Sequence, residues 1–329
     1  MALTLVEAAK YSNDVLQRGV IELLVKDDPV MEQLPFKVIK GNGLTYNVES
    51  VLSGVAAYAV GDTWVESTSE VTQTTAHLTI LGGDADTDNF LEATRGDLQG
   101  LMVEQIAAKT KALKREFLRQ AIYGYVTGFP KEFDGLHYMI RNSTAGQNNT
   151  VATATTSGTS ILLKLERLEK AVDLVRGERP DLILMSKQMR RSINQYLNGV
   201  GGITKTETQG KTVQTLVDIP IAVTDYIRDN ESADLQYGSN EAAAAVYGHN
   251  YADTDGGDDD GGTTIFVVRF APESFCGLHS GPLTVEKLGS LETKDAKRVR
   301  LKWYVAVMLQ KVITCSKVTG IDVDGVVAV

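Results

Sequence analysis

The densest group of potential metal ligands in the chain is a run of aspartates interleaved with glycines. It comprises Asp253, Asp255, Gly256, Gly257, Asp258, Asp259, Asp260, Gly261 and Gly262. Closely spaced carboxylates on a flexible backbone can coordinate calcium through their oxygens. The run lacks the closing glutamate of an EF-hand loop, so a solvated surface loop is the favoured interpretation. The secondary interpretation is a cation site formed by Asp253, Asp255, Asp258 and Asp260.

Other residue types that support catalysis are present, but not at catalytic spacing. The chain has four histidines: His77, His137, His249 and His279. None lies in an HExxH motif or beside paired carboxylates at ligand spacing. Gly210-Lys211-Thr212 resembles the end of a P-loop, but a lysine, Lys205, stands where the motif has glycine. With neither GxSxG nor GxGxxG in the sequence, we assign no catalytic residue and no cofactor, and an enzyme of unknown type is the least favoured function.

The composition is typical of a globular protein made in a reducing cytoplasm. The chain has 329 residues, of which 43% are hydrophobic, and no run approaches the roughly 20 apolar residues of a membrane span. Cys276 and Cys315 fit neither a disulfide framework nor a metal motif, and residues 1–10 lack a secretory pattern. The net charge of −9 opposes tight nucleic-acid binding by the whole protein, because affinity for phosphates comes largely from cationic contacts.

Two alternating segments predict a long β-arm from about Phe36 to Leu81. Each limb has one apolar face, since side chains on a strand switch faces at every residue. The apolar positions are Phe36, Val38, Leu44, Tyr46, Val48, Ala76, Leu78 and Ile80. Gly41 and Gly43 indicate a bulge, and the tip from Glu49 to Glu70 is too long for a tight turn. An isolated ribbon is marginal in water, so the arm is expected to pack on its own domain or on a neighbouring molecule.

A helix of unusual length is predicted from about Asp88 to Tyr123, which at about 1.5 Å per residue would extend about 50 Å. Its apolar stripe comprises Leu91, Leu98, Leu101, Met102, Ile106, Leu113, Phe117 and Ile122. Charges suit its dipole, with Asp84, Asp86 and Asp88 before it and Lys109, Lys111, Lys114, Arg115 and Arg119 in its second half. These cations have no interleaved aromatic residues for base stacking, so pairing with nearby acids is favoured over nucleic-acid binding.

The remaining segments predict helices and short strands. Thr4 and Glu7 form a capping box in an N-terminal helical arm whose stripe ends at Asp28-Pro29. A loop from Asn142 to Ser160 then precedes an alternation typical of a compact α/β domain. Its helices are Ile161–Val175 and Ser186–Tyr196, and its strands are Pro180–Met185, Ile219–Val223 and Ile265–Val268. The last two β runs, Val299–Val307 and Val312–Val318, have no helix between them and are expected to pair antiparallel.

Seven short motifs follow one another along nearly the whole chain. They are Ala56–Trp64 (AAYAVGDTW), Leu81–Asp86 (LGGDAD), Phe133–Leu136 (FDGL), Leu184–Arg191 (LMSKQMRR), Asp218–Tyr226 (DIPIAVTDY), Leu288–Lys294 (LGSLETK) and Arg298–Tyr304 (RVRLKWY). Each is short, but their order is specific. Together with the order of the elements, they resemble the major capsid proteins of tailed bacteriophages, which have the Hong Kong 97-type capsid fold.

The resemblance implies an α+β fold in five parts. These are an N-terminal arm (1–35), an extended β-arm or E-loop (36–85), a peripheral domain with the spine helix (86–150), an α/β axial domain (151–270) and a return to the peripheral sheet (271–329). The arm would lie across an adjacent subunit, and the acidic loop would project from the axial domain. Many relatives carry a scaffolding segment ahead of the mature sequence, whereas helix is predicted here by Thr4. No residue pattern supports the Lys–Asn crosslinks of some relatives.

The function implied by the resemblance is structural. The chain would self-assemble into pentamers and hexamers of an icosahedral shell that encloses the double-stranded DNA genome of a tailed phage. Its expected partners are copies of itself, a portal protein, scaffolding and decoration proteins, and packaged DNA bound without sequence specificity, but no membrane. It would be made in the host bacterial cytoplasm and reside in the virion. An encapsulin-type shell around cargo protein is the alternative.

The arm and the long helix are the expected places of contact between subunits. The residues assigned to these contacts are Glu49, Tyr58, Asp62, Trp64, Glu66, Lys109, Arg115 and Arg119.

Overall fold

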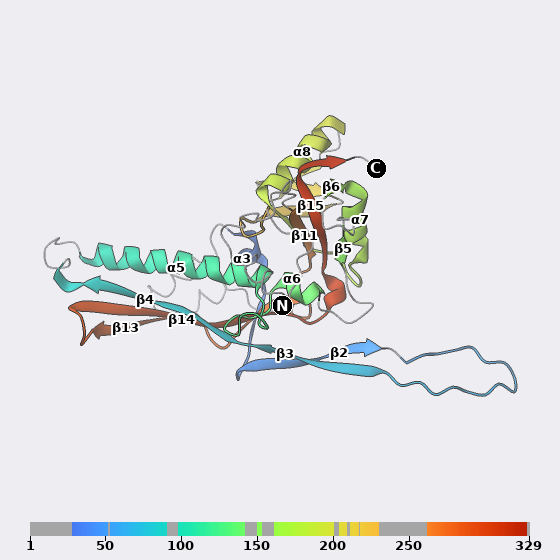
Figure 1. The fold of residues 1–329 in the computed structure, drawn as a ribbon, viewed down its shortest axis with the longest axis horizontal. Coiled ribbons are helices and arrows are strands. Elements are labelled where there is room, and N and C mark those ends of the chain that lie inside the picture. The colour runs from blue at the N-terminus through green and yellow to red at the C-terminus, as the bar shows by residue number, and fades with distance from the viewer. Residues whose placement is uncertain are drawn as a thin grey trace, which may run out of the picture.

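The computed structural model describes residues 28–51, 53–90, 98–141, 150–152, 161–200, 204–208, 211–216, 218–229 and 262–327. The predicted capping box at Thr4 and the candidate cation ligands Asp253, Asp255, Asp258 and Asp260 lie outside these residues. The described part forms two packed bodies and one long arm that projects away from both (Figure 1).

The first body, here the wing body, is a five-stranded sheet with a long helix on it (Figure 1). Its strands are β1 (Phe36–Val38), β4 (Thr79–Asp88), β12 (Phe275–His279), β13 (Thr284–Ser290) and β14 (Ala296–Leu309). The central strand β14 pairs antiparallel with β12 and β13 along one edge and with β4 along the other. The short strand β1 pairs parallel with β12. One 14-residue strand therefore holds the whole sheet together.

The helix of the wing body is α5 (Leu98–Tyr123), which has 26 residues and a length of about 39 Å at 1.5 Å per residue. Its predicted apolar stripe is confirmed at four positions, since Ile106, Leu113, Phe117 and Ile122 are buried. The facing side of β14 alternates as expected for a strand with one covered face. Val299, Leu301, Trp303 and Val305 are buried, and the residues between them reach the opposite face.

Asp84, Asp86 and Asp88 lie in β4, paired with β14. The next residues, Asn89 and Phe90, are helical, and the Phe90 N–H donates to Asp88 Oδ1 at 2.8 Å, which is where the long helix was predicted to begin. Carboxylates suit a helix N-terminus and equally suit an exposed strand face opposite arginines. The predicted stripe before Asp28 lies outside the described residues. Asp28-Pro29 begins the short helix α3 (Pro29–Gln33), where Asp28 Oδ1 accepts hydrogen bonds from the backbone N–H groups of Val30 and Met31 at 2.9 and 3.4 Å.

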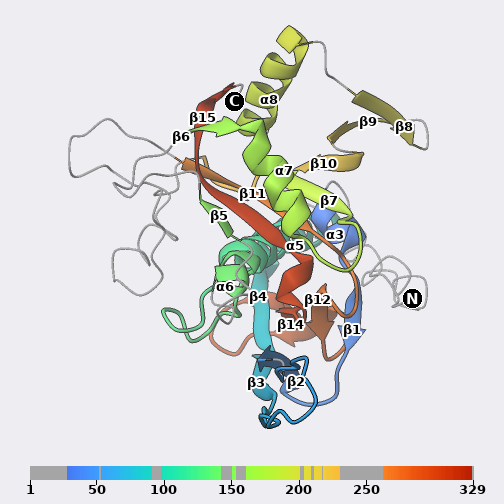
Figure 2. The same ribbon diagram turned by 90° about the vertical axis from the view of Figure 1, so that its right-hand side faces the viewer.

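The second body, here the upper body, is an eight-stranded mixed sheet in the order β5-β15-β11-β7-β10-β9-β8, with β6 also on β15 (Figure 2). Its strands are β5 (Thr150–Ala152), β6 (Ile161–Lys164), β7 (Leu182–Met185), β8 (Thr204–Thr208), β9 (Lys211–Leu216), β10 (Ile219–Val223), β11 (Gly262–Val268) and β15 (Ser316–Val327). Its helices are α7 (Leu165–Leu174) and α8 (Lys187–Val200). The predicted helix from Ile161 therefore begins as a strand and becomes helical at Leu165.

The central strands β7 and β11 of the upper sheet are buried on both faces. On β7, Ile183 and Met185 pack with α7 and α8, whereas Leu182 and Leu184 belong to the core shared with the wing body. This explains why these strands are continuous apolar runs, as predicted for Pro180–Met185. The predicted cap of α8 is confirmed, because the backbone N–H of Met189 donates to Ser186 Oγ at 3.1 Å.

The last two β runs do not pair with each other, contrary to the prediction. A 3-10 turn at Val312–Thr314 separates β14 from β15. Beyond this turn the chain leaves the wing sheet, and β15 pairs antiparallel with β11 and parallel with β5 and β6 in the upper sheet. The C-terminal strand is thus part of the upper body.

The two bodies meet at a buried polar junction between α6 (Leu136–Arg141) and β15. His137 and Lys317 are 2% and 1% exposed. Lys317 Nζ donates to the backbone oxygen of His137 at 2.9 Å and lies 3.3 Å from its Nδ1. The His137 ring stacks on Tyr123 at the end of α5 and meets the edge of Phe266 on β11. Burial, together with the positive charges of Lys317 and Arg141, holds the pKa of His137 well below 6.5.

This junction predicts that acid weakens the subunit. The native state disfavours protonation of His137. The stability that the neutral ring contributes is therefore fully present above the unfolded pKa of about 6.5 and is lost as pH falls below it. Each pH unit below that point costs at most about 1.4 kcal/mol. Urea unfolding of wild type and of His137→Gln between pH 7.5 and 5 measures the effect, and the variant should lose less stability than wild type.

The matched control is His77→Gln, because His77 is exposed on the arm and its replacement should leave the pH dependence of unfolding unchanged. Parallel pH profiles for wild type and His137→Gln would contradict the prediction.

Candidate inter-subunit surface

The predicted β-arm is present as a two-stranded antiparallel ribbon of β2 (Gly43–Val51) and β3 (Glu70–His77). The pairing runs from Gly43 opposite His77 to Val51 opposite Glu70, and the bulge lies between Glu49 and Val51 instead of at Gly41 and Gly43. The flanking segments Phe36–Val38 and Thr79–Leu81 are strands of the wing sheet and not of the arm. The projecting part is therefore shorter at its base than the sequence indicated.

Polar contacts fix the base of the arm to the wing body. The hydroxyl of Tyr46 donates to the backbone oxygen of Leu309 at 3.3 Å, and burial raises the pKa of Tyr46 to about 12. Thr79 Oγ1 donates to the backbone oxygen of Val305 at 3.1 Å. Both acceptors lie on β14, so the central strand of the wing sets the direction in which the arm leaves.

The tip of the arm, residues 53–69, has an internal structure of its own. Tyr58 and Trp64 stack with ring centroids 4.4 Å apart and planes at 23°. The Val65 N–H donates to the Tyr58 hydroxyl at 3.1 Å, and the Ala59 N–H donates to Asp62 Oδ2 at 2.6 Å. Gly61 turns the chain at a φ of +95°, a conformation that costs glycine little.

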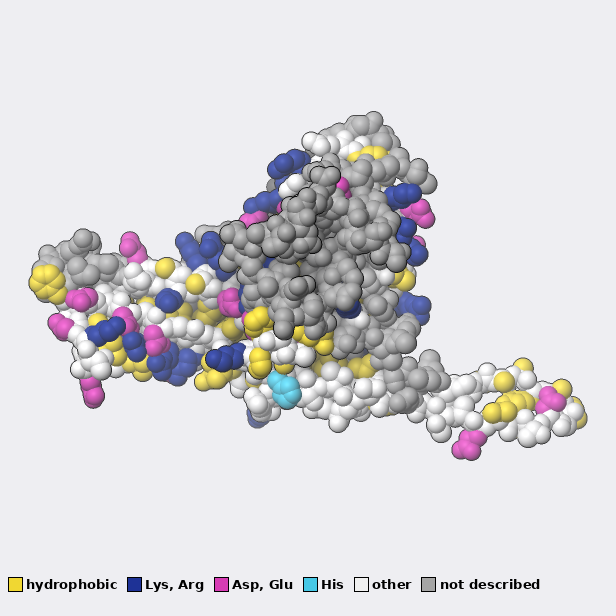
Figure 3. Space-filling view, viewed as in Figure 1, with side chains coloured by type: hydrophobic (Ala, Val, Ile, Leu, Met, Phe, Trp, Pro, Cys, Tyr) yellow, Lys and Arg dark blue, Asp and Glu magenta, His cyan; other side chains and the backbone are white. Residues whose placement is uncertain are grey.

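The tip exposes large apolar side chains. Val55 is 96% exposed and Trp64 is 78% exposed, and Val60 and Val65 are exposed as well. Figure 3 shows hydrophobic and acidic side chains together at the end of the arm, far from both bodies. Contiguous exposed apolar groups on a soluble protein mark a surface that is covered by something else.

The arm and the long helix carry opposite charge. Residues 43–77 include four acids, Glu49, Asp62, Glu66 and Glu70, and neither lysine nor arginine. Helix α5 has five cations, Lys109, Lys111, Lys114, Arg115 and Arg119, against two acids, Glu104 and Glu116. Opposite potentials favour association and fix its register.

The three predicted cationic contact residues differ in their exposure and in their contacts within the subunit. Arg119 is committed within its own subunit, where it forms ion pairs with Glu116 and, at 2.6 Å, with Glu132. Lys109 is exposed, and its charge helps to lower the pKa of Asp84. Arg115 is exposed and hydrogen-bonds to Tyr226. Of the five predicted arm residues, four lie in the tip, and Glu49 lies at the outer end of β2 opposite Val71.

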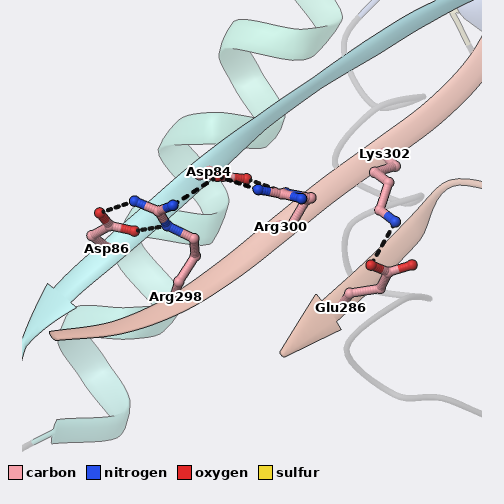
Figure 4. Close-up of polar contacts among 6 residues, drawn as sticks. All are labelled: Asp84, Asp86, Glu286, Arg298, Arg300 and Lys302. Atoms are coloured by element: carbon pink, nitrogen blue, oxygen red, sulfur yellow. Dashed lines mark hydrogen bonds and ion pairs between the residues drawn. The ribbon is translucent and has the colours of Figure 1, made fainter. Parts of the chain in front are cut away.

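A charged ladder on the outer face of the wing sheet was missed from the sequence (Figure 4). Arg300 makes two hydrogen bonds to Asp84 at 2.7 and 2.8 Å, and Arg298 makes two to Asp86 at 2.6 and 2.7 Å. These hydrogen bonds lower the pKa of both aspartates. The sequence did contain a signal for this ladder. Two acids lie two residues apart at 84 and 86, and two arginines lie two residues apart at 298 and 300. Residues two apart share a strand face, so the two pairs could have been predicted to face each other on paired strands.

The described residues offer little for catalysis. They include no group of three or more His, Cys, Asp or Glu side chains arranged to hold a metal ion. Within the same residues, no helix has the length and apolar character needed to cross a bilayer. The notable geometry is instead an arm and a helix of opposite charge in a subunit that does not cover the arm's tip.

Comparison with known families addresses the first half of the chain. Residues 12–165 match the family described as major capsid protein GP7. Over these residues the chain is similar to a major capsid protein. The match includes the arm and α5. A search of curated proteins finds no match to this chain.

Solved structures confirm the predicted Hong Kong 97-type fold of this chain. The subunit in the holo-SrpI encapsulin complex of Synechococcus elongatus PCC 7942 is similar with a TM-score of 0.62 and 14% identity, over 93% of this chain and 91% of that chain. The capsid of the native GTA particle gives 0.56 and 10%, over 91% and 90%. Mycobacterium phage Bobi gives 0.54 and 13%, over 97% and 99%. At these identities the likeness concerns the fold.

Proposed function

We propose that this chain is the major capsid protein of a tailed phage and self-assembles into pentamers and hexamers of an icosahedral shell that encloses the double-stranded DNA genome. The observation that carries the proposal is the projecting arm. Its apolar tip is exposed in the single subunit, and covering it requires a second molecule because the base of the arm is fixed to β14.

The five predicted parts receive roles under this proposal. The N-terminal arm and the projecting ribbon of β2 and β3 extend to neighbouring subunits, residues 86–150 and 271–315 together with β1 and β4 supply the peripheral domain, and residues 151–270 together with β15 form the axial domain at the capsomer centre. The strand β15 contributes to the axial sheet because it pairs with β11. The contacts between subunits involve Glu49, Tyr58, Asp62, Trp64 and Glu66 of the arm, and Lys109 and Arg115 of α5. Arg119 instead stabilises α5 within its own subunit through its ion pairs with Glu116 and Glu132.

The proposed partners follow from a shell that encloses DNA. They are other copies of the chain, a portal protein, and scaffolding and decoration proteins, with DNA held without sequence specificity. The net charge of −9 suits such a container, because like charges repel and DNA is enclosed without tight binding. We expect synthesis in the host bacterial cytoplasm, residence in the virion and no enzymatic activity.

An encapsulin-type shell is the second candidate, favoured by the likeness to the SrpI subunit. Electron microscopy of purified particles, followed by nuclease treatment and analysis of the contents, separates the two. Closed icosahedral particles that protect double-stranded DNA are expected. Particles that contain only a cargo enzyme would favour the encapsulin, and a subunit that stays monomeric under all assembly conditions would refute both.

A further inference from the structure

We propose that the tip of the arm is a receptor for one lysine or arginine side chain of a second copy of this chain. The receptor consists of the open face of Trp64 and the carboxylates of Asp62 and Glu66. The inference rests on the proposed assembly and adds to it the chemistry by which the tip recognises its neighbour.

The aromatic part of the receptor is already formed in the single subunit. Trp64 is 78% exposed while one face of its ring stacks on Tyr58, so the solvent-facing side includes the other face. Tyr58 is itself held by the Val65 N–H at its hydroxyl. A cation over a ring face is attracted by the ring quadrupole, and tryptophan is the strongest such partner. A prearranged ring also loses little conformational freedom on binding.

The anionic part comes from the residues on either side of Trp64 in the sequence. Asp62 and Glu66 are exposed and lie two positions before and after Trp64. Asp62 Oδ2 accepts from the Ala59 N–H at 2.6 Å, which holds the carboxylate in the turn around Gly61. The tip also exposes the apolar groups Val55, Val60 and Val65. Once covered, they would exclude water and strengthen the attraction between the carboxylates and a cation.

The arm contains no cation that could occupy the receptor. No lysine or arginine occurs between Lys40 and Arg95, and the tip lies far from the basic residues of its own wing body (Figure 3). The cation must therefore come from another molecule, and a shell of identical chains supplies it on a second copy.

Charge complementarity indicates where that cation lies. Helix α5 has the surplus of basic residues, and among them Lys111 and Arg115 are exposed and separated by four positions. Residues at this spacing share one helix face. A guanidinium can also stack flat on an indole, which makes Arg115 of the second copy the preferred occupant and Lys111 the neighbour that pairs with a carboxylate.

The first test follows Trp64 by fluorescence in the full-length protein. The chain has two tryptophans, and Trp303 is 1% exposed, so iodide should quench Trp64 alone in free subunits. Assembly should remove most of this quenching. Particles in which Trp64 remains as quenchable as in free subunits would overturn the receptor while leaving the proposed shell intact. Failure of wild type to form any particle would overturn the proposed function and the receptor together.

The second test separates cation recognition from simple apolar contact. Trp64→Leu keeps an apolar side chain without a ring face, and Trp64→Phe keeps a weaker ring. The subunit concentration needed for assembly should rise about tenfold for Trp64→Leu and clearly less for Trp64→Phe. Arg115→Met should resemble Trp64→Leu, whereas Lys170→Met, which removes an exposed charge on α7, should assemble as wild type. Equal effects of Leu and Phe, or wild-type assembly of both Arg115→Met and Lys111→Met, would overturn the receptor.

Discussion

Replacement of residues 50–70 by Asn-Gly should leave a folded subunit that no longer forms particles. The change joins Glu49 and Val71, which are partners in the ribbon, through two residues that favour a tight hairpin turn. The removed tip is exposed, and the hydrogen bonds of Asp62, Tyr58 and Ser67 are made within it. Stability should therefore change by less than about 1 kcal/mol, while assembly loses its main contact with the neighbour.

Circular dichroism and urea unfolding report the folded state, and sedimentation with electron microscopy reports assembly. Ser69→Ala, which keeps the length and the apolar residues of the tip, is the control and should assemble normally. Particles of normal size and stability from the shortened chain would show that the arm does not hold neighbouring subunits together.

Trp303→Ala should lower the free energy of unfolding by about 3–5 kcal/mol, the usual cost of removing a large aromatic side chain from a core. Trp303 is 1% exposed on β14. Its ring centroid lies 5.0 Å from that of Phe117 on α5 and 5.7 Å from that of Phe36 on β1. One side chain thus joins the central strand, the helix above it and the edge of the sheet, and its loss leaves a cavity at the point where all three meet.

Tyr304→Ala supplies the matched control, because Tyr304 is the next residue on the same strand but faces outward and is 42% exposed. Its replacement should cost about 1 kcal/mol or less. Urea unfolding of unassembled subunits measures both variants. Similar losses for the two would contradict the assignment of Trp303 as the centre of the wing core.

The sequence predicted those elements whose side-chain period was clear. The alternation in Val299–Val307 and the stripe of Ile106, Leu113 and Phe117 both reflect one covered face, and period alone identifies such faces. The boundaries of the helices and strands were predicted less well from the sequence. The acids at 84 and 86 fit the approach to a helix and a strand face equally well, and only their pairing with β14, more than 200 residues away, shows that they lie on a strand that precedes the helical residues Asn89 and Phe90.

Strand pairing was the part of the fold that the sequence predicted least well. β14 and β15 are neighbours in sequence, and adjacent strands often pair, but the 3-10 turn between them redirects the chain into the upper sheet. The candidate contact residues show the same limit. Arg119 was predicted to be a contact residue because it is a cation on the long helix. In the structure it forms an ion pair with Glu132, thirteen residues later, within the same subunit. The side-chain periodicity and the order of the motifs were thus enough to predict the fold and to suggest the function. Contacts between residues distant in sequence could be identified only in the structure.

The continuity of β3 and β4 has a mechanical consequence. Only Leu78 separates the arm strand from a wing strand that is paired with β14 over ten residue pairs. A pull along the arm is therefore applied parallel to β4, so the hydrogen bonds of that pairing are loaded together in shear and do not open one after another. The Asp84–Arg300 and Asp86–Arg298 pairs cross the same boundary. Tension from a neighbouring subunit would be spread over the full length of the wing before any single bond had to break.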